Sequence, residues 1–363
     1  MLGLLPCSPC QRDMNGENNV MMQEIWKKIK RQEFAPVYLM YGQESFLINE
    51  TKQLLIQTAL NPEEEDFNLS TYDLEEVSIE LAIEDAETIP FFGDRKVIVL
   101  QNPFFLTSEK TKSKVEHDVK RLEAYLNEPS PYTIIVFTGS YEKLDERKKI
   151  TKEMKKNAEI LEAKKLNEQE LKNWMKQRAS YNKVELDNDA LDSLLSIAGT
   201  NLFLLTSEVD KMALYVQDSK LITKEIVEEL AAKSLEQNIF ALVEKIINKR
   251  IDEALRIYYD LLKQNEEPLK MLAIITNQFR LIYQVKALAK TGYGQQQIAS
   301  VLKVHPFRVK LAAGQANRFT DEELTRCISM FAEADYQMKT SGMNKTMIIE
   351  MILFKLGQAN TNA

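Results

Sequence analysis

The sequence predicts a mixed α/β domain followed by domains made only of helices. Up to residue 163, short β-prone apolar runs alternate with helical patterns, which is typical of a parallel sheet with helices on both faces. Beyond residue 164 the β signal stops, and helical periodicity continues to residue 357. With 363 residues, the chain is long enough for two or three domains with hydrophobic cores.

The predicted sheet domain has alternating strands and helices. The run KVIVLQ (96–101) is almost entirely apolar, as expected of a strand that is covered on both faces. In the segment 44–60, apolar residues such as Phe46, Leu54 and Leu55 fall mostly on one helical face. Strands are predicted at 35–42, 67–73, 96–101, 132–139 and 158–163, and helices at 44–60, 77–88, 109–126 and 145–157.

The helical part begins with a capping box, in which Asn167 precedes Glu170 by three residues. Ser234 and Gln237 repeat this pattern, so we place a second boundary there. Helices between the two boundaries are predicted at 167–182, 187–199, 201–216 and 223–233. The predicted domains are a disordered extension at 1–21, an α/β domain at 22–163, a small helical domain at 164–233, a second helical domain at 234–357 and a tail at 358–363.

The composition indicates a globular protein without a metal site. The net charge is −7, so any nucleic-acid contact would need a local basic face. Three cysteines are too few for a disulfide framework, and Cys7 and Cys10 form an isolated CxxC pair that lacks two further zinc ligands. The sequence has no apolar run of about 18 residues. We therefore expect a cytoplasmic protein with no membrane segment, metal or other cofactor.

A parallel α/β domain followed by a small helical domain suggests a nucleotide-binding ATPase, but the catalytic residues are missing. A phosphate loop needs a Lys for the phosphates and a Ser or Thr for Mg²⁺. In YGQESFLINE (41–50), Phe46 and Leu47 stand where those residues would act. The strand IIVFTG ends in Thr138 and Gly139, where an acidic pair would hold Mg²⁺. The two histidines form no triad, so we predict that the chain is not an enzyme.

The stretch AETIPFFGDRKVIVL (86–100) places two adjacent phenylalanines just before a predicted strand. Pro90 ends the preceding helix near Thr88, so residues 90–93 should form a protruding corner. In one interpretation, the rings pack onto the core of their own domain. In the other, they form a wedge that fits an apolar pocket on another protein, because clustered aromatic residues often dominate interfaces. The wedge residues are Ile89, Pro90, Phe91 and Phe92.

Several stretches together resemble one family, the delta subunit of the bacterial DNA polymerase III clamp loader. The first two are VYLMYGQESFLINE and IPFFGDRKVIVL, which are similar to the opening strand with its degenerate phosphate loop and to the clamp-binding corner. The resemblance runs from about residue 22 to residue 357. The further stretches that carry it are KLDERKKITKEMKKNAEI, LLSIAGTNLFLLTSEVDKMALY, VHPFRVKLAAGQANRFT and ADYQMKTSG.

The resemblance implies an AAA+-like α/β domain, a small helical lid domain and a C-terminal helical collar domain for oligomerisation. It implies a subunit that hydrolyses no ATP, binds the ring-shaped sliding clamp and opens it for loading onto primed DNA. The implied partners are the ATPase subunits (tau/gamma) and delta-prime, in a pentamer. The clamp contact of the family falls on Ile89, Pro90, Phe91 and Phe92, with Phe91–Phe92 where many relatives carry Leu–Phe.

Two alternatives concern nucleic acid. The segment 294–313 resembles a helix-turn-helix, with Arg308 and Lys310 as the candidates for base contacts, so a DNA-binding regulator is the alternative function. A packed helical hairpin explains the same pattern. A lysine-rich helix has the pattern of a solvated face, and its lysines are also candidates for DNA phosphate contacts. Its residues are Lys148, Lys149, Lys152, Lys155 and Lys156.

Overall fold

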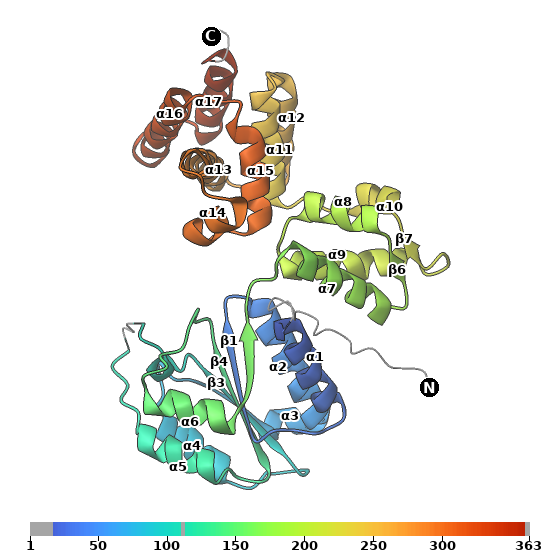
Figure 1. Ribbon diagram of the computed structural model, residues 1–363, viewed down its shortest axis with the longest axis vertical. Helices are drawn as coiled ribbons and strands as arrows, with labels where there is room; N and C mark the ends of the chain where they lie inside the picture. The colour runs from blue at the N-terminus through green and yellow to red at the C-terminus, as the bar shows by residue number, and fades with distance from the viewer. Residues whose placement is uncertain (1–16, 110–112, 360–363) are drawn as a thin grey trace, which may run out of the picture. The chain divides into compact units, whose positions relative to one another are not determined.

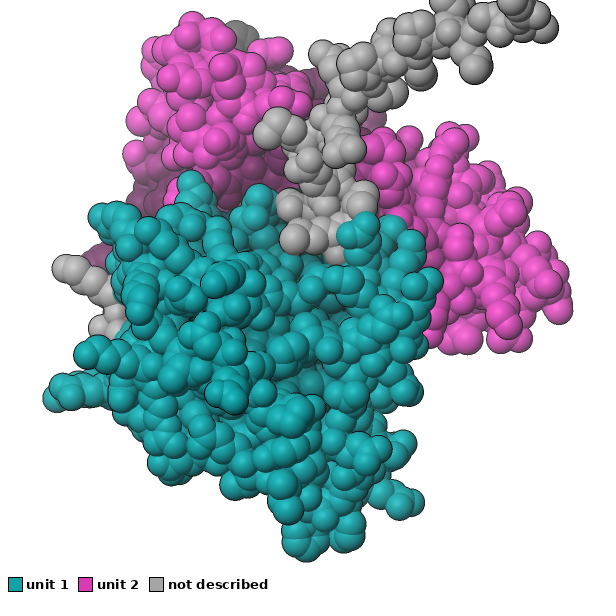
Figure 2. All heavy atoms as spheres, turned by 60° about the horizontal axis from the view of Figure 1, so that its bottom comes forward, with its two compact units in different colours: residues 1–166 teal, residues 167–363 magenta. Residues whose placement is uncertain are grey.

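A computed structural model describes residues 17–109 and 113–359 of the chain. Contacts divide the chain after Leu166 into two compact units, which are shown in two colours in Figure 2. Each unit has its own hydrophobic core. The division into three domains stays a prediction, and Cys7 and Cys10 lie outside the described residues.

The first unit is built on a five-stranded parallel sheet with the order β2-β3-β4-β1-β5 (Figure 1). Its central strands β1, β3 and β4 are almost completely buried, as expected for apolar runs covered on both faces. The strands are β1 (Val37–Gly42), β2 (Leu69–Asp73), β3 (Lys96–Gln101), β4 (Thr133–Gly139) and β5 (Glu159–Ala163). Each strand pair is parallel, which confirms the predicted sheet.

Helices cover both faces of this sheet (Figure 1). On one side lie α1 (Glu17–Lys30) and α2 (Ser45–Ala59), with the short α3 (Pro62–Asn68) preceding β2. On the other side lie α4 (Ile79–Glu87), α5 (Val119–Asn127) and α6 (Lys149–Asn157), and a single 3₁₀ turn, η1 (Phe104–Leu106), follows β3. The core on this second side combines strand residues such as Ile98 and Phe137 with Ile83, Leu122 and Met154 from the three helices.

The second unit is helical. Its first part contains α7 (Glu168–Tyr181), α8 (Asn188–Ala198), α9 (Leu202–Tyr215), α10 (Lys224–Leu230) and a two-residue strand pair, β6 (Glu185–Leu186) with β7 (Leu221–Ile222). The capping box predicted at Asn167 is present. The second part contains α11 (Leu235–Ile247), α12 (Ile251–Lys263), α13 (Pro268–Lys290), α14 (Gln295–Leu302), α15 (Pro306–Ala316), α16 (Asp321–Thr340) and α17 (Lys345–Ala359).

Four local predictions differ from the structure. Residues 17–21, which we assigned to a disordered extension, begin helix α1. Helix α5 starts only at Val119, because the Asp118 side chain accepts hydrogen bonds from two backbone N–H groups and caps the helix there. Helix α3 and the strand pair β6–β7 were not predicted. Within the described ranges, no helix is long and apolar enough to cross a membrane.

Candidate functional site

The candidate site begins with helix α4, whose inward face anchors it to the sheet. Ile79, Ala82, Ile83 and Ala86 are fully buried, and their spacing of three and four residues puts them on one helical face. The helix ends at Glu87, and the extended backbone of its C-cap residue Thr88 leads into Ile89 and Pro90. Pro90 explains this end, because the residue before a proline, here Ile89, avoids the helical conformation.

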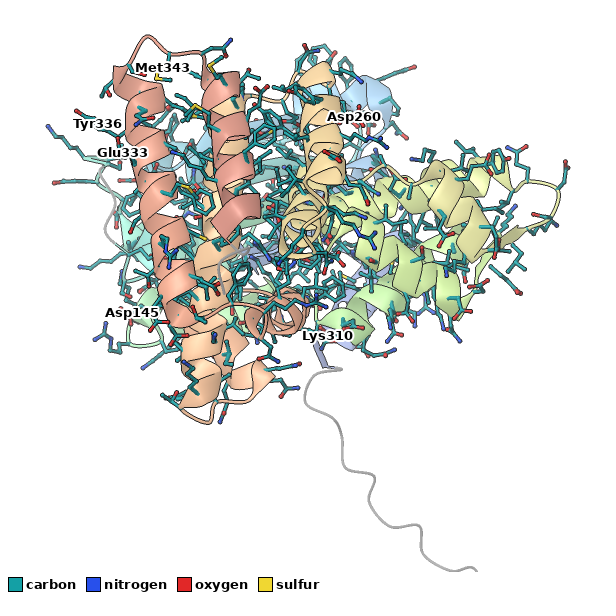
Figure 3. All side chains as sticks on the ribbon, turned by 90° about the horizontal axis from the view of Figure 1, so that it is seen from above. Asp145, Asp260, Lys310, Glu333, Tyr336 and Met343 are labelled. Carbon is teal, nitrogen blue, oxygen red and sulfur yellow. The ribbon has the colours of Figure 1, made fainter. Side chains whose placement is uncertain are left out.

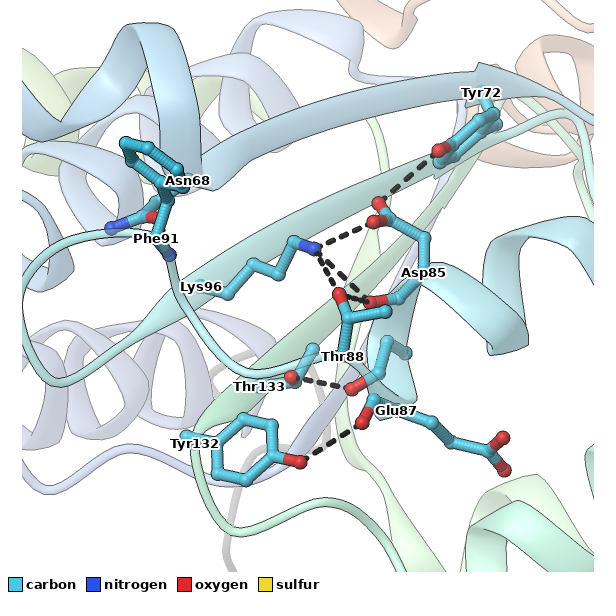
Figure 4. Close-up of polar contacts among 10 residues, drawn as sticks. Asn68, Tyr72, Asp85, Glu87, Thr88, Phe91, Lys96, Tyr132 and Thr133 are labelled. Atoms are coloured by element: carbon cyan, nitrogen blue, oxygen red, sulfur yellow. Dashed lines mark hydrogen bonds and ion pairs between the residues drawn. The ribbon is translucent and has the colours of Figure 1, made fainter.

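Side chains from neighbouring strands hold the last turn of α4 (Figure 4). The ammonium of Lys96 donates to the backbone carbonyl of Asp85 at 3.1 Å and to Thr88 Oγ1 at 2.8 Å. Thr133 donates to the carbonyl of Ala86 at 2.7 Å, and Tyr132 to that of Glu87 at 2.9 Å. Carbonyls at a helix C-terminus lack partners within the helix, so these contacts satisfy them and fix where the chain leaves α4.

An ion pair lies behind these contacts. Lys96 Nζ is 2.5 Å from Asp85 Oδ1, and the Lys96 side chain is almost buried. Tyr72 donates a second hydrogen bond to Asp85, at 3.1 Å. Burial raises the pKa of Asp85, but hydrogen bonds from Lys96, Ser70 and Tyr72 outweigh it and lower that pKa below its usual value. Asp85 is therefore charged at neutral pH, and the pair is formed.

The wedge residues that follow α4 point into solvent. Ile89 is 75% exposed, Phe91 is 71% exposed and Phe92 is 52% exposed, while Pro90 is half-buried. The two phenylalanine rings meet edge to face, with centroids 4.7 Å apart. The interpretation in which the rings pack onto their own domain core is therefore wrong for this structure. Large apolar side chains gathered in solvent are typical of a surface that binds another molecule.

Helix α3 contributes two residues to this site that the sequence analysis missed. Asn68, which lies beside Phe91 in Figure 4, is fully buried. Its side chain accepts a hydrogen bond from the Phe91 N–H at 3.0 Å and donates one to the Phe92 carbonyl at 2.5 Å. Phe67 is exposed and contacts both wedge rings. Gly93 then turns the chain into β3 with φ +65°, a conformation that favours glycine.

The loop after β1, where an ATPase would bind phosphate, is packed against β5. The N–H of Glu44 donates to the carbonyl of Ala163 at 2.9 Å. Gly42 has φ +138°, and a Cβ there would lie 2.1 Å from the same carbonyl oxygen. Burial raises the pKa of Glu44, although the Phe46 N–H and Lys165 act against it. At the end of β4, a Cβ on Gly139 would lie 2.5 Å from the ring of Tyr141.

The candidate DNA-contacting lysines differ in their surroundings. The Lys148 ammonium donates to the backbone carbonyls of Phe105 and Thr107 at 2.9 and 2.6 Å. Lys149 pairs with Glu123 at 2.6 Å, and Lys155 pairs with Glu146. Lys152 is exposed on α6. Lys148 therefore faces backbone carbonyls, Lys149 and Lys155 face carboxylates of their own unit, and Lys152 faces solvent.

The segment with the helix-turn-helix pattern forms the consecutive helices α14 and α15. Ile298 and Val309 are buried in the core of the second unit, so the two helices pack as a hairpin. Arg308 lies 3.8 Å from a carboxylate oxygen of Glu236. Lys310, which is labelled in Figure 3, lies 3.9 Å from a carboxylate oxygen of Glu168. Both candidate base-reading side chains therefore lie next to carboxylates of their own unit.

Metal and thiol chemistry have little support among the described residues. No group of three or more His, Cys, Asp or Glu side chains in ranges 17–109 and 113–359 has the geometry of a metal site. Cys327 is a buried free thiol, and burial raises its pKa to about 11. Such a thiol stays protonated near neutral pH and is a poor nucleophile.

Comparison with known proteins gives a consistent result along the chain. The family models "DNA polymerase III, delta subunit" and "DNA polymerase III delta subunit, C-terminal domain" match residues 38–164 and 236–356, and a model described as "middle domain" matches 167–229. The DNA polymerase III subunit delta of Bacillus subtilis (strain 168) is 47% identical over 340 residues, which cover 94% of this chain and 98% of that protein.

Two further matches agree with these. A probable DNA polymerase III subunit delta of Aquifex aeolicus (strain VF5) is 25% identical over 251 residues, covering 68% of this chain and 72% of that protein. The solved structure of the Bacillus subtilis DNA clamp loader delta protein has a TM-score of 0.77 at 47% identity, covering 93% of this chain and 99% of that one. The predicted parallel α/β sheet domain followed by a helical part is confirmed. The chain belongs to the family of DNA polymerase III delta subunits, which are components of the clamp loader.

Proposed function

We propose that this chain binds the ring-shaped sliding clamp through Ile89, Pro90, Phe91 and Phe92 and favours the open ring. The observation that carries the proposal is an apolar wedge that stands in solvent on an anchored support. The three large side chains of the wedge offer apolar area that a partner pocket can cover. The anchored end of α4 means that little conformational entropy is lost when the wedge binds.

Ring opening by this route needs no chemistry in the delta subunit itself. A clamp ring has closed and open states, and a ligand shifts that equilibrium only by the difference between its affinities for the two. A wedge that seats beside a ring interface, with α4 (Ile79–Glu87) pressing next to it, gains most contact when that interface is open. Binding energy alone then favours the open ring.

We assign ATP hydrolysis to other subunits of the assembly. The carbonyl of Ala163 accepts the Glu44 N–H and lies against Gly42, so it occupies the place where this loop would bind phosphate. Thr138 and Gly139 stand where an acidic pair would hold Mg²⁺. The chain would act in the cytoplasm, in a pentamer with the ATPase subunits (tau/gamma) and delta-prime, around primed DNA. Of the candidate phosphate contacts, Lys152 fits best, because Lys148 and Lys149 already face protein oxygens.

The decisive experiment is the double substitution Phe91→Ala with Phe92→Ala. Burial of one aromatic ring is worth roughly 1.5–3 kcal/mol, so the loss of two should weaken clamp binding by about 100-fold or more. Binding is measured by calorimetry with the purified sliding clamp encoded in the same genome. Because both rings are exposed, thermal melting and circular dichroism should stay close to wild type.

The chain offers a matched control. Leu214 and Tyr215 are also adjacent, large and exposed, and they lie on α9 in the second unit. The pair Leu214→Ala with Tyr215→Ala should bind the clamp as wild type does. Wild-type affinity in the Phe91/Phe92 double variant would refute the proposed binding site.

A further inference from the structure

The wedge is part of a cluster of three aromatic rings from two separate segments of the chain. Phe67, at the end of α3, stacks on Phe91 with centroids 5.5 Å apart and an angle of 20° between the ring planes. It meets Phe92 edge to face, with centroids 5.4 Å apart and an angle of 80°. Each ring therefore contacts the other two, and all three belong to one surface feature.

Phe67 is not buried beneath the other two rings. Its residue is 56% exposed, slightly more than Phe92, although it touches both of its neighbours. A ring that only supported the wedge from below would be covered by the rings it supports. The exposure of Phe67 instead extends the aromatic surface beyond the wedge, onto α3, where the neighbouring residues Glu65 and Asp66 are acidic.

Asn68 connects the two segments from inside. Its side-chain amide is fully buried and bonds to the N–H of Phe91 and to the carbonyl of Phe92, as a neighbouring strand would. A buried amide needs such partners, since an unsatisfied buried polar group costs free energy. Asn68 is the residue directly after Phe67. One short segment therefore supplies the third ring and also holds the backbone of the two residues that carry the other rings.

We infer that Phe67 is a third clamp-contacting ring and that Asn68 is a positioning residue that holds Phe91 and Phe92 in their binding conformation. The inference rests on the proposed function, and the partner is the same apolar pocket region of the sliding clamp. The pocket must then accept a face of three rings, wider than a two-residue tip. Short loops lose affinity when their bound conformation has to be ordered on binding, and Asn68 removes that cost beforehand.

The contact role is tested with Phe67→Ala, titrated against the purified sliding clamp beside Phe91→Ala/Phe92→Ala. Phe67→Ala should weaken binding about tenfold or more, the loss that marks an energetically important interface residue. Phe354→Ala, which removes a similarly exposed phenylalanine from α17, should not change it. If Phe67→Ala binds within twofold of wild type while the double variant has lost binding, the inference is wrong and the proposed function stands. If the double variant binds normally, the proposed function fails.

The positioning role is tested with Asn68→Ala and Asn68→Leu. The leucine keeps the approximate size of the side chain but loses both the acceptor for Phe91 N–H and the donor to the Phe92 carbonyl, so it also serves if the cavity left by alanine prevents folding. Both should speed hydrogen exchange at the Phe91 amide and weaken clamp binding about threefold to tenfold, with all three rings still present. Binding is measured well below the melting temperature of each variant. Unchanged exchange, or faster exchange with wild-type affinity, would overturn the assignment of Asn68.

Discussion

Lys96 joins the end of α4 to the sheet, and its contribution to stability can be measured. Its ammonium is bonded to the Asp85 carboxylate and carbonyl and to Thr88. Lys96→Met would leave the Asp85 carboxylate partly buried without its cation. We expect the free energy of unfolding of the first unit to fall by about 3 kcal/mol, the lower end for breaking a buried ion pair, because Asp85 keeps some contact with solvent.

This prediction is best measured by urea unfolding in a Trp174→Phe background. The chain has two tryptophans, so Trp26 in α1 then reports on the first unit alone. Because the pKa of Asp85 is lowered, the pair is fully formed at neutral pH, and its stabilisation is lost as the pH falls from 3.8 through that lowered value. Lys155→Met removes an exposed pair with Glu146 and should cause no measurable change. An equal effect of both substitutions would contradict the role given to Lys96.

The corner that carries the wedge could be predicted from local sequence, but the exposure of its rings and their partners could not. Pro90 and Gly93 fix a corner by backbone chemistry alone, which leaves open whether Phe91 and Phe92 face the core or solvent. Asn68 precedes Phe92 by 24 positions, and the FNLSTYD pattern favours a strand that includes Phe67. Only the folded chain shows that Phe67 and Asn68 end a helix and reach the wedge.

Helix α4 also has a pH-sensitive contact at its beginning. The Nδ1 atom of His117 accepts a hydrogen bond from the Ile79 N–H at 3.1 Å, which requires that nitrogen to be unprotonated. Burial among Phe104 and Phe105 lowers the pKa of His117, although Glu80 and the Leu74 backbone raise it in part. The first unit should therefore be fully stable above the usual pKa of 6.5 and lose stability as the pH falls from 6.5 through the lowered value.

His117→Gln tests this expectation. We expect the urea midpoint of the first unit to fall between pH 7.5 and pH 5.5 in wild type and to fall less in the variant. The other histidine, His305, lies on the second unit, so Trp26 fluorescence in the Trp174→Phe background separates the two. If the urea midpoint of wild type and of His117→Gln fell equally with pH, groups other than His117 would cause the pH dependence.

The loop between β1 and α2 leads to a prediction about nucleotide. Glu44 N–H, which an ATPase loop would offer to phosphate, already bonds to the carbonyl of Ala163, and the half-buried Glu44 precedes the first residue of α2. We expect calorimetry to detect no saturable ATP binding by the purified chain, with an ATPase clamp-loader subunit as the positive control. A micromolar site would contradict the packing described for this loop.

Strands were easier to predict than helices in this chain. The three central strands of the sheet are apolar runs whose burial on both faces leaves a plain signal, and all five strands were predicted within a few residues. Helix α5 begins later than predicted because residues 109–118 are rich in charge and offer no apolar face to bury. Helices α1 and α3 were missed, and α3 is the one that brings Phe67 to the candidate site.

The division of the chain into two units leads to the last prediction. Strand β5 ends at Ala163 and α7 begins at Glu168, and Lys164 and Lys165 between them are exposed. Brief trypsin treatment of the folded protein should therefore cut after one of these lysines and yield two stable fragments, because exposed connections are the preferred sites of proteolysis. Mass spectrometry of the products checks the position of the cut.

The N-terminal fragment from such a digest should retain the clamp affinity of the full chain. The wedge, Phe67 and the groups that hold them (Asn68, Lys96, Tyr132 and Thr133) all belong to the first unit, and none of their contacts described above reaches beyond Leu166. Calorimetry with the purified sliding clamp compares the fragment with the intact chain, and the C-terminal fragment serves as the control that should not bind. A fragment that keeps the melting behaviour of a folded unit but binds far more weakly than the intact chain would show that clamp binding also needs residues of the second unit.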